Sequence, residues 1–306
     1  VSHEFRTPLT LISHAINEIA EDEDICTNKY VNIIKHNTGK LSNMVNELLD
    51  FHRVEVKSAQ LRTTYTSIPE YVSDIYEEFK GWAEASDIHV NLQIDNPEIG
   101  MWIDPEHFGK ILSNILSNSI RYSHAGSEIN IQVAKGYVND IVPRYKDSFW
   151  NTKDMIPGEQ AIIRVSDTGI GMEKAVLPTI FKRFHQVQNN TGKQHTGSGI
   201  GLSLVKSLIE LHHGGIIISS KPDAGTEVII ALPISDTYLA KEEKIEESTF
   251  VLKDYLSNYA VEYEPLEIEE TTAIYMEGKP TILLVDDNHE ILMILREYFV
   301  KDYNII

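Results

Sequence analysis

The chain has 306 residues, 42% hydrophobic and 24% charged, which is the composition of a globular protein with about two or three domains. Its net charge of −19, from 27 Lys and Arg against 46 Asp and Glu, argues against a nucleic-acid-binding surface and against peripheral binding to an anionic membrane. The single cysteine, Cys26, excludes an internal disulfide and fits a reducing compartment. No apolar run is long enough to predict a membrane span in these residues.

The first ten residues, VSHEFRTPLT, place His3 directly before Glu4. A carboxylate beside an imidazole can orient the ring and take up its proton, so the pair suits a nucleophilic histidine. Thr7 lies one helical turn beyond His3 on the same face, and Pro8 would bend or loosen the helix just after it. Taken alone, the His-Glu pair favours an ordinary surface histidine on an amphipathic helix, and only the rest of the chain favours the nucleophile.

Two helices are predicted in the first 58 residues. Apolar side chains recur at helical spacing from Phe5 to Ile19, an acidic turn follows at 21–24, and a second apolar stripe runs from Tyr30 to His52. Two such helices cannot bury both stripes by themselves, whereas two copies of the hairpin could form a four-helix bundle. We therefore expect a homodimer, with a coiled-coil spacer as the alternative.

A second domain begins after Ser58, where the periodicity changes. A helix is predicted over 68–85 and a strand over 88–94, followed by a helix that carries the sequence ILSNILSNSIRYS. Asn114 and Asn118 project from one face of this helix. Their amide oxygens could ligate a hard cation and their NH₂ groups could contact phosphate, although two solvated asparagines would give the same pattern.

Strands are predicted at 129–134 and 161–165, separated by a polar insertion at 136–160 to which we assign no chemistry. The second strand runs into the sequence SDTGIGM, which contains Asp167. Its glycines let the backbone approach a ligand, and Asp167 can accept a hydrogen bond from an exocyclic amine. A tight loop is one alternative. An aspartic-protease motif is another, but it would need a second such aspartate and an all-β chain.

The sequence TGSGIGLSL at 196–204 opens a helix that is predicted to run to about His212. Glycines at a helix N-terminus expose backbone N–H groups to phosphate, and the helix dipole favours an anion there. Their spacing fits neither a Rossmann turn nor a phosphate loop that ends in Gly-Lys-Ser/Thr. Strands at 216–220 and 226–232 close the domain around a turn that contains Gly225.

The remaining residues predict a linker and the start of another domain. Residues 236–279 hold twelve acidic and four basic side chains and are expected to be a linker. The sequence PTILLVDDN at 280–288 predicts a buried strand that ends in Asp286 and Asp287, followed by a helix over 289–299. Paired carboxylates at the end of a parallel strand suit Mg²⁺.

The motifs, in this order, resemble those of sensor histidine kinases over residues 1–234. His3 to Thr10 is similar to the H-box, 111–123 to the N-box, 166–172 to the G1 box, 180–186 (IFKRFHQ) to the F-box and 196–204 to the G2 box. The resemblance implies an α+β fold: an antiparallel helical hairpin forming a dimeric four-helix bundle, then an α/β-sandwich ATP-binding domain of the GHKL type. The implied domains are 1–58 for dimerisation and histidine phosphotransfer, 59–235 for ATP binding, 236–279 as a linker and 280–306 as the start of a receiver domain.

The resemblance also assigns roles to residues. It implies ATP and Mg²⁺ as cofactors, with Asn118 as the metal ligand, Arg121 at the phosphates and Asp167 on the adenine amino group. His3 would be the phosphoacceptor, Glu4 its base and Thr7 an orienting group for water in a phosphatase reaction. The implied nucleotide-binding residues are Asn114, Asn118, Arg121, Tyr122, Asp167, Gly169, Gly171, Gly197, Gly199, Gly201, Leu202 and Thr226.

The start of a receiver domain implies a hybrid kinase in which His3 passes its phosphoryl group to a receiver aspartate in cis, or to a separate response regulator. We expect this chain to be a cytoplasmic part of a longer protein anchored in the bacterial inner membrane. Two alternatives stay open. One is a dimeric scaffold without catalysis. The other is an ATPase of the same fold without a phosphohistidine, against which the histidine motif and the helical hairpin argue.

Overall fold

The computed structural model describes residues 9–13, 15–16, 27–55, 60–183, 199–246, 250–253, 255–256 and 278–285, and also 292, 295–296, 298–300 and 302–306. The chain divides into two compact units. One comprises residues 1–42, 188–196 and 261–306, and the other comprises 43–187 and 197–260. In the described residues, no helix has the length and apolar composition that crossing a bilayer requires.

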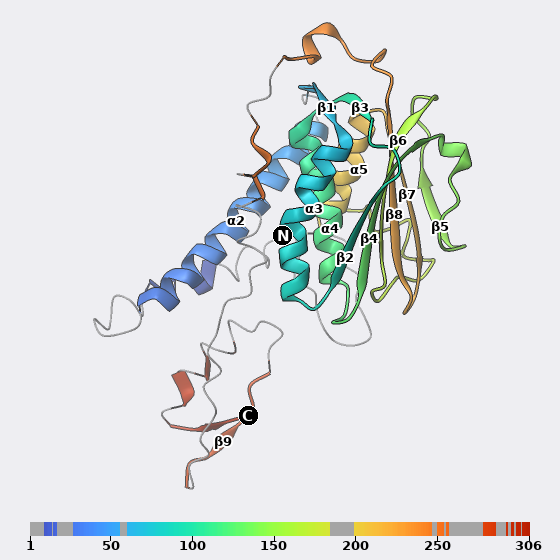
Figure 1. Cartoon of the computed structure of the whole chain (residues 1–306). Coiled ribbons are helices and arrows are strands. Elements are labelled where there is room, and N and C mark those ends of the chain that lie inside the picture. Colours follow the sequence, from blue (N-terminus) through green and yellow to red (C-terminus); the bar gives the residue numbers. More distant parts are fainter. Residues whose placement is uncertain are drawn as a thin grey trace. The chain divides into compact units, whose positions relative to one another are not determined.

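A six-stranded mixed sheet forms the centre of the second unit, in the order β2-β4-β6-β8-β7-β5 (Figure 1). Strands β2 and β4 run parallel, and every other neighbouring pair is antiparallel. The strands are β2 (His89–Ile94), β4 (Glu128–Gly136), β5 (Ser148–Asn151), β6 (Gln160–Asp167), β7 (Gly215–Lys221) and β8 (Gly225–Pro233).

Three helices, α3 (Ile68–Ala85), α4 (Pro105–Arg121) and α5 (Gly201–Leu211), cover one face of this sheet (Figure 1). Each helix buries an apolar side, including Phe79 of α3 and Phe108 of α4, against strands whose apolar side chains are also buried. The arrangement is a two-layer α/β sandwich, as predicted. A short antiparallel pair, β1 (Thr64–Ser67) and β3 (Gly100–Ile103), lies outside the six-stranded sheet.

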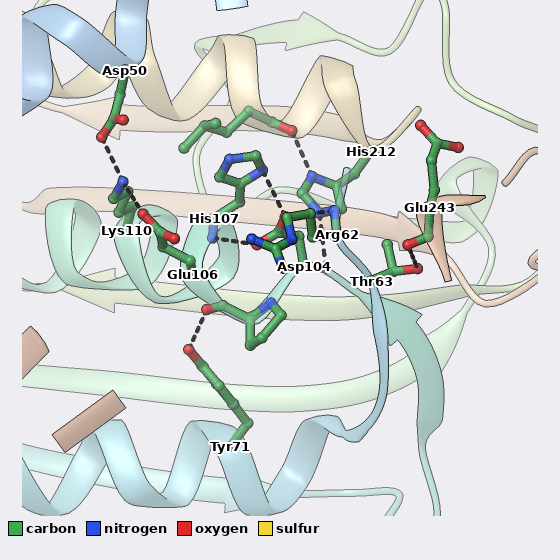
Figure 2. Close-up of polar contacts among 12 residues, drawn as sticks. Asp50, Arg62, Thr63, Tyr71, Asp104, Glu106, His107, Lys110, His212 and Glu243 are labelled. Atoms are coloured by element: carbon green, nitrogen blue, oxygen red, sulfur yellow. Dashed lines mark hydrogen bonds and ion pairs between the residues drawn. The ribbon is translucent and has the colours of Figure 1, made fainter. Parts of the chain in front are cut away.

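Helix α4 begins at a capping residue and a proline. The Asp104 side chain accepts a hydrogen bond from the backbone N–H of His107 (3.1 Å), and Pro105 fills the first helical position. The other oxygen of Asp104 accepts from the backbone N–H of Arg62 at 2.9 Å (Figure 2). Asp104 therefore fixes the start of α4 to the segment that enters β1, and this helix carries the predicted asparagines.

Two histidines are buried beside this cap. His212, at the C-terminal end of α5, is fully buried, and its Nδ1 donates to the carbonyl of Leu208 at 2.8 Å. Its ring lies edge to face with that of His107, with centroids 5.8 Å apart (Figure 2). Burial lowers the pKa of His212 to about 4 and also lowers the pKa of His107. Both rings are therefore neutral in the folded protein at neutral pH.

Acid is expected to destabilise the fold through this pair. Histidine in the unfolded chain titrates near 6.5. The unfolded state therefore binds more protons between about pH 6.5 and about pH 4. The free energy of unfolding should fall through that window, by up to about 1.4 kcal/mol per pH unit for each histidine. Urea midpoints at about pH 7.5 and pH 5 should differ less in His212→Gln than in the wild type.

The matched control is His89→Gln, on an exposed side chain of β2, which should keep the wild-type pH dependence. If His212→Gln loses as much stability in acid as the wild type, the buried pair is not the source of the effect.

Helix α2 (Thr27–Glu55) is 29 residues long and contains the apolar stripe predicted from Tyr30 to His52. In its first half Tyr30 and Ile33 are buried, whereas Val45, Leu48 and Leu49 in its second half are 38–49% exposed. Near its end, Asp50 accepts a hydrogen bond from Lys110 of α4 at 2.5 Å (Figure 2). Burial alone would lower the pKa of Lys110, but hydrogen bonds to Asp50 and Glu106 outweigh it and raise the pKa, so this lysine stays charged.

The chain after β8 turns back onto the same unit. The backbone N–H of Thr63 donates to the carbonyl of Glu243 at 2.6 Å, and the N–H of Ile245 donates to the carbonyl of Thr63 at 2.9 Å. The Thr63 hydroxyl also donates to the carbonyl of Glu243 at 2.9 Å (Figure 2). The first residues of the stretch expected to be a linker, 236–279, are therefore held beside β1. In the other unit, β9 (Thr281–Ile282) and β10 (Asn304–Ile305) pair in parallel. Asp286 and Asp287 lie outside the described residues.

Candidate nucleotide site

Asp167, the last residue of β6, lies at the centre of the candidate site. It is only 6% exposed, and its Oδ1 accepts hydrogen bonds from the backbone N–H of Gly169 (2.9 Å) and of Thr226 (3.1 Å). Gly169 lies so close to the carbonyl oxygen of Tyr122 that a β-carbon would overlap it, and Ile170 donates to that carbonyl at 3.0 Å. The ends of α4 and β6 and the start of β8 therefore meet at Asp167.

The charge state of Asp167 reflects opposing effects. Burial raises the pKa of its carboxyl group, whereas the hydrogen bonds from Gly169, Thr226 and the Ser119 hydroxyl lower it, and the nearby Arg144 also lowers it. An ionised carboxylate has about four acceptor positions. Three protein donors leave about one position open, which is what a single donor such as an exocyclic amine would need.

Two glycines with positive φ allow the backbone to pack tightly around Asp167. Gly171 (φ +63°) lies against the carbonyl of Lys221, and Gly225 (φ +108°) lies against the carbonyl of Asp167 itself. A β-carbon at either position would overlap those carbonyl oxygens, so both the conformation and the space require glycine. The loop after β6 and the turn between β7 and β8 thus form one closely packed wall.

Helix α4 supplies the predicted asparagines and meets the start of α5. Asn114 is buried, and its Nδ2 donates to the carbonyl of Lys110 at 2.9 Å. Its Oδ1 lies directly against the α-carbon of Gly201, where a β-carbon would overlap it. Asn118 is half-buried one turn further on, and Arg121 and Tyr122, also half-buried, end the helix. The N-box and the glycine-rich segment are therefore in contact at Asn114 and Gly201.

The glycine-rich segment is described from Gly199 onwards. Gly199 has a positive φ of 64°, Gly201 begins α5, and Leu202 is half-buried in its first turn. Gly197 lies outside the described residues, as do His3, Glu4 and Thr7 of the first motif. Of the predicted nucleotide-binding residues, the structure thus brings together those of α4, the β6 loop, the α5 start and β8.

Two serines of the site were not singled out in the sequence. Ser119 contributes a hydrogen bond to Asp167. The hydroxyl of Ser220 accepts from the backbone N–H of Met172 (2.8 Å) and lies 2.9 Å from the hydroxyl of Thr226. Asp167 and Met172 lie far in the chain from Ser119 and Ser220, respectively, so no local pattern marks these contacts. The position of Ser119 immediately after Asn118 was the available signal.

The residues present fit ATP and a metal ion carried by it. The open acceptor position on Asp167 suits the adenine amino group, and α5 begins with the glycines that suit phosphate. In the described part of the chain, no three His, Cys, Asp or Glu side chains gather to hold a metal by themselves. The amide oxygen of Asn118 is a hard ligand suited to Mg²⁺, which typically keeps substrate phosphates and waters as its other ligands.

Comparison with known families agrees with this geometry. Residues 103–236 match the model described as Histidine kinase-, DNA gyrase B-, and HSP90-like ATPase. Residues 1–56 match the model of the His Kinase A (phospho-acceptor) domain. Residues 103–236 are therefore similar to this ATPase class, and residues 1–56 are similar to a phospho-acceptor domain.

Several proteins named histidine kinase are similar to this chain. Histidine kinase P4 of Formosa agariphila is 28% identical over 315 residues, which cover 100% of this chain and 21% of that protein. Acinetobacter baumannii histidine kinase AdeS shares the fold with a TM-score of 0.55 at 20% identity, covering 76% of this chain and 98% of that one. Histidine kinase ThkA, solved in complex with the response regulator protein TrrA, has a TM-score of 0.54 at 21% identity. The match covers 77% of this chain and 60% of that one.

Residues 1–56 and 103–236 each match a model that includes histidine kinases, and the whole chain is similar to histidine kinase P4. The chain spans about a fifth of the length of the relative from Formosa agariphila. The activity, substrates and partners of the whole protein are therefore taken up as proposals.

Proposed function

We propose that this chain is the kinase portion of a hybrid two-component sensor, and that it transfers the γ-phosphoryl group of ATP to His3. The observation that carries the proposal is the buried carboxylate of Asp167. Two backbone N–H groups from separate segments hold it, and about one acceptor position stays open for adenine. Two positive-φ glycines, Gly171 and Gly225, pack the walls around it.

The phosphate end of the site follows from α4 and α5. Asn118 would ligate Mg²⁺, Arg121 would neutralise charge on the phosphates, and Gly197, Gly199 and Gly201 would offer backbone N–H groups at the start of α5. The metal ion, when bound with the nucleotide, neutralises charge on the phosphate oxygens. Tyr122, whose carbonyl accepts from Ile170, would lie beside the nucleotide.

The phosphoacceptor chemistry is assigned to the first motif. His3 would attack the γ-phosphorus in line, the bond to the leaving β,γ-bridging oxygen would break, and ADP would leave. Glu4 would hold the imidazole tautomer and take the ring proton. In a second, phosphatase reaction, Thr7 would orient a water molecule for hydrolysis of a receiver phospho-aspartate. These roles are supported by the sequence pattern alone. His3, Glu4 and Thr7 lie outside the described residues.

We further propose that the chain works as a homodimer. Val45, Leu48 and Leu49 lie on the second half of α2 and are 44%, 38% and 49% exposed. Exposed aliphatic side chains at helical spacing favour association with another helix, and a second copy would complete a four-helix bundle. The match of residues 1–56 to the phospho-acceptor domain model supports this arrangement.

The phosphoryl group would pass from His3 to a receiver aspartate, in cis or on a separate response regulator. Support for a receiver in cis comes from the strand-like sequence at 280–288 and the parallel pairing of β9 with β10, since receivers have parallel sheets. Support for a separate partner comes from the complex of ThkA with a response regulator. The full-length protein would be anchored in the bacterial inner membrane, with the kinase portion in the cytoplasm, where ATP is available.

Phosphorylation with γ-labelled ATP tests the proposal that Asn118 ligates Mg²⁺. Asn118→Ala should lower the initial rate of label incorporation by about 100-fold or more, because the proposed ligand of the metal ion that neutralises charge on the phosphates is lost. Omission of Mg²⁺ should remove incorporation by the wild type. Asn91→Ala is the control, since the Asn91 side chain is exposed on β2 and donates to the side chain of Asn130 on β4 at 3.1 Å. Equal rates for Asn118→Ala and Asn91→Ala would contradict the assignment.

A further inference from the structure

The insertion between β4 and β6, residues 137–159, was assigned no chemistry in the sequence, yet it packs beside the candidate nucleotide site. It contains a short 3₁₀ turn (Val138–Asp140) and the edge strand β5, which pairs antiparallel with β7. Between these elements, Tyr145 contacts the turn that joins β7 to β8 at Ala224, beside the wall against Asp167 described above.

The Tyr145 side chain makes the first contact. Its hydroxyl donates a hydrogen bond to the carbonyl of Ala224 at 2.5 Å. The next residue, Gly225, packs against the backbone of Asp167, and Thr226 then donates its N–H to the Asp167 carboxylate. The hydrogen bond from Tyr145 thus fixes the turn at Ala224, two residues before Thr226, whose N–H holds the Asp167 carboxylate.

A second contact ties the insertion to β8. The backbone N–H of Arg144 donates to Glu227 Oε2 at 2.7 Å, and the N–H of Tyr145 donates to Ser219 Oγ at 3.4 Å. Glu227 is 6% exposed and is held in place by an ion pair with Arg164 (3.2 Å). Residues 144–145 therefore bond to Ala224 and to Glu227. These two residues flank Thr226 in the sequence, and Thr226 donates to Asp167.

The charges agree with this proximity. The guanidinium of Arg144 lies over the ring of Tyr145, 5.3 Å from its centroid. Burial raises the pKa of Asp167, and Arg144 is the cation of the described residues that counteracts it. Elsewhere in the insertion, Phe149 packs against Phe181 of the F-box with ring centroids 5.5 Å apart. The insertion therefore contacts two motifs of the candidate site.

We propose that Tyr145 is a positioning residue for nucleotide recognition: its hydroxyl holds the β7–β8 turn so that Asp167 can accept the exocyclic amine of adenine. The inference rests on the proposed function and adds to it, because it assigns a role in base selection to an insertion outside the five motifs. Tyr145 contacts no nucleotide in this proposal and acts only through Ala224, Thr226 and Asp167.

The test is Tyr145→Phe, which removes one hydroxyl and keeps the ring. ATP and inosine triphosphate, which has a carbonyl in place of the amine, serve as probes in titration calorimetry with Mg²⁺. The dissociation constant for ATP should rise about threefold to tenfold, the effect of one lost hydrogen bond, while that for inosine triphosphate stays unchanged. In phosphorylation assays the KM for ATP should rise by the same factor with kcat unchanged. Tyr137→Phe, on an exposed tyrosine of the same insertion, should match the wild type in every measurement.

Three outcomes separate the inference from the function on which it rests. Equal weakening of both nucleotides, or a fall in kcat with KM unchanged, would show a general structural role and overturn the inference. Wild-type affinity for ATP in Tyr145→Phe would also overturn the inference about Tyr145. The proposed nucleotide site would then still be tested by the substitution Asp167→Asn. Failure of the wild type to bind ATP at all would instead overturn the proposed function.

Discussion

Replacing Asp167 by asparagine is expected to raise the dissociation constant for ATP·Mg²⁺ by about 100-fold or more. A hydrogen bond to a charged group contributes about 1.5–3 kcal/mol, and each 1.4 kcal/mol is a factor of ten. The substitution also exchanges an acceptor oxygen for an NH₂ donor in a site where Gly169, Thr226 and Ser119 all donate. Two losses therefore combine, the contact to adenine and the geometry of the loop.

The same variant should lose its preference for ATP over inosine triphosphate. An asparagine NH₂ can donate to the 6-carbonyl of inosine, whereas the carboxylate of Asp167 can only accept. Titration calorimetry with both nucleotides measures the two dissociation constants directly. Unchanged discrimination in Asp167→Asn would place the base elsewhere in the protein.

The matched control makes the same chemical change on a neighbouring aspartate. Asp223 is exposed in the β7–β8 turn with a positive φ of 56°, a conformation that asparagine adopts readily. Asp223→Asn should bind ATP like the wild type. If both variants lose affinity equally, the loss reflects the net charge or the turn and does not reflect contact with adenine.

Long periodic elements of the second unit were predictable from the sequence. The helix expected over 68–85 is α3 with the same bounds, and the strands expected at 129–134, 161–165, 216–220 and 226–232 lie within β4, β6, β7 and β8. These elements bury continuous apolar runs, and a proline or a capping residue marks the starts of α3 and α4. Local pattern and tertiary packing favour the same structure in each case.

The short strands could not be predicted in the same way. β5 comprises the four residues SFWN, which show no clear alternation, and its strand conformation depends on pairing with β7, more than sixty residues later. β1 depends likewise on pairing with β3. For the same reason the contacts of the insertion could not be predicted. Tyr145 bonds to Ala224, which lies 79 residues later in the chain, and no local sequence pattern indicates a contact at that separation.

The candidate site was predicted in its glycines and in Asp167 but not in its serines. Gly-x-Gly spacing and an aspartate at a strand end are local patterns. Ser119 and Ser220 act through hydroxyl groups that are common on any helix or strand, and only the fold brings them to Asp167 and Met172. The roles of the nucleotide-binding residues stay predictions, as do those of His3, Glu4 and Thr7.

Substitution of His3 has the largest expected effect of all. His3→Gln keeps a polar side chain of similar length but removes the nucleophilic ring nitrogen, so phosphoryl transfer to the protein should fall to background. ATP binding should be unchanged, because the nucleotide site lies in a separate domain. His14→Gln, eleven residues later in the same predicted helix, is the matched control and should be labelled like the wild type.

The most direct test of the account is the position and chemical stability of the label after incubation with γ-labelled ATP and Mg²⁺. We predict a label that is labile in acid and stable in base, present in the wild type and in His14→Gln and absent from His3→Gln. Label that persists in His3→Gln, or that survives acid as a phosphoester would, contradicts a histidine kinase that uses His3.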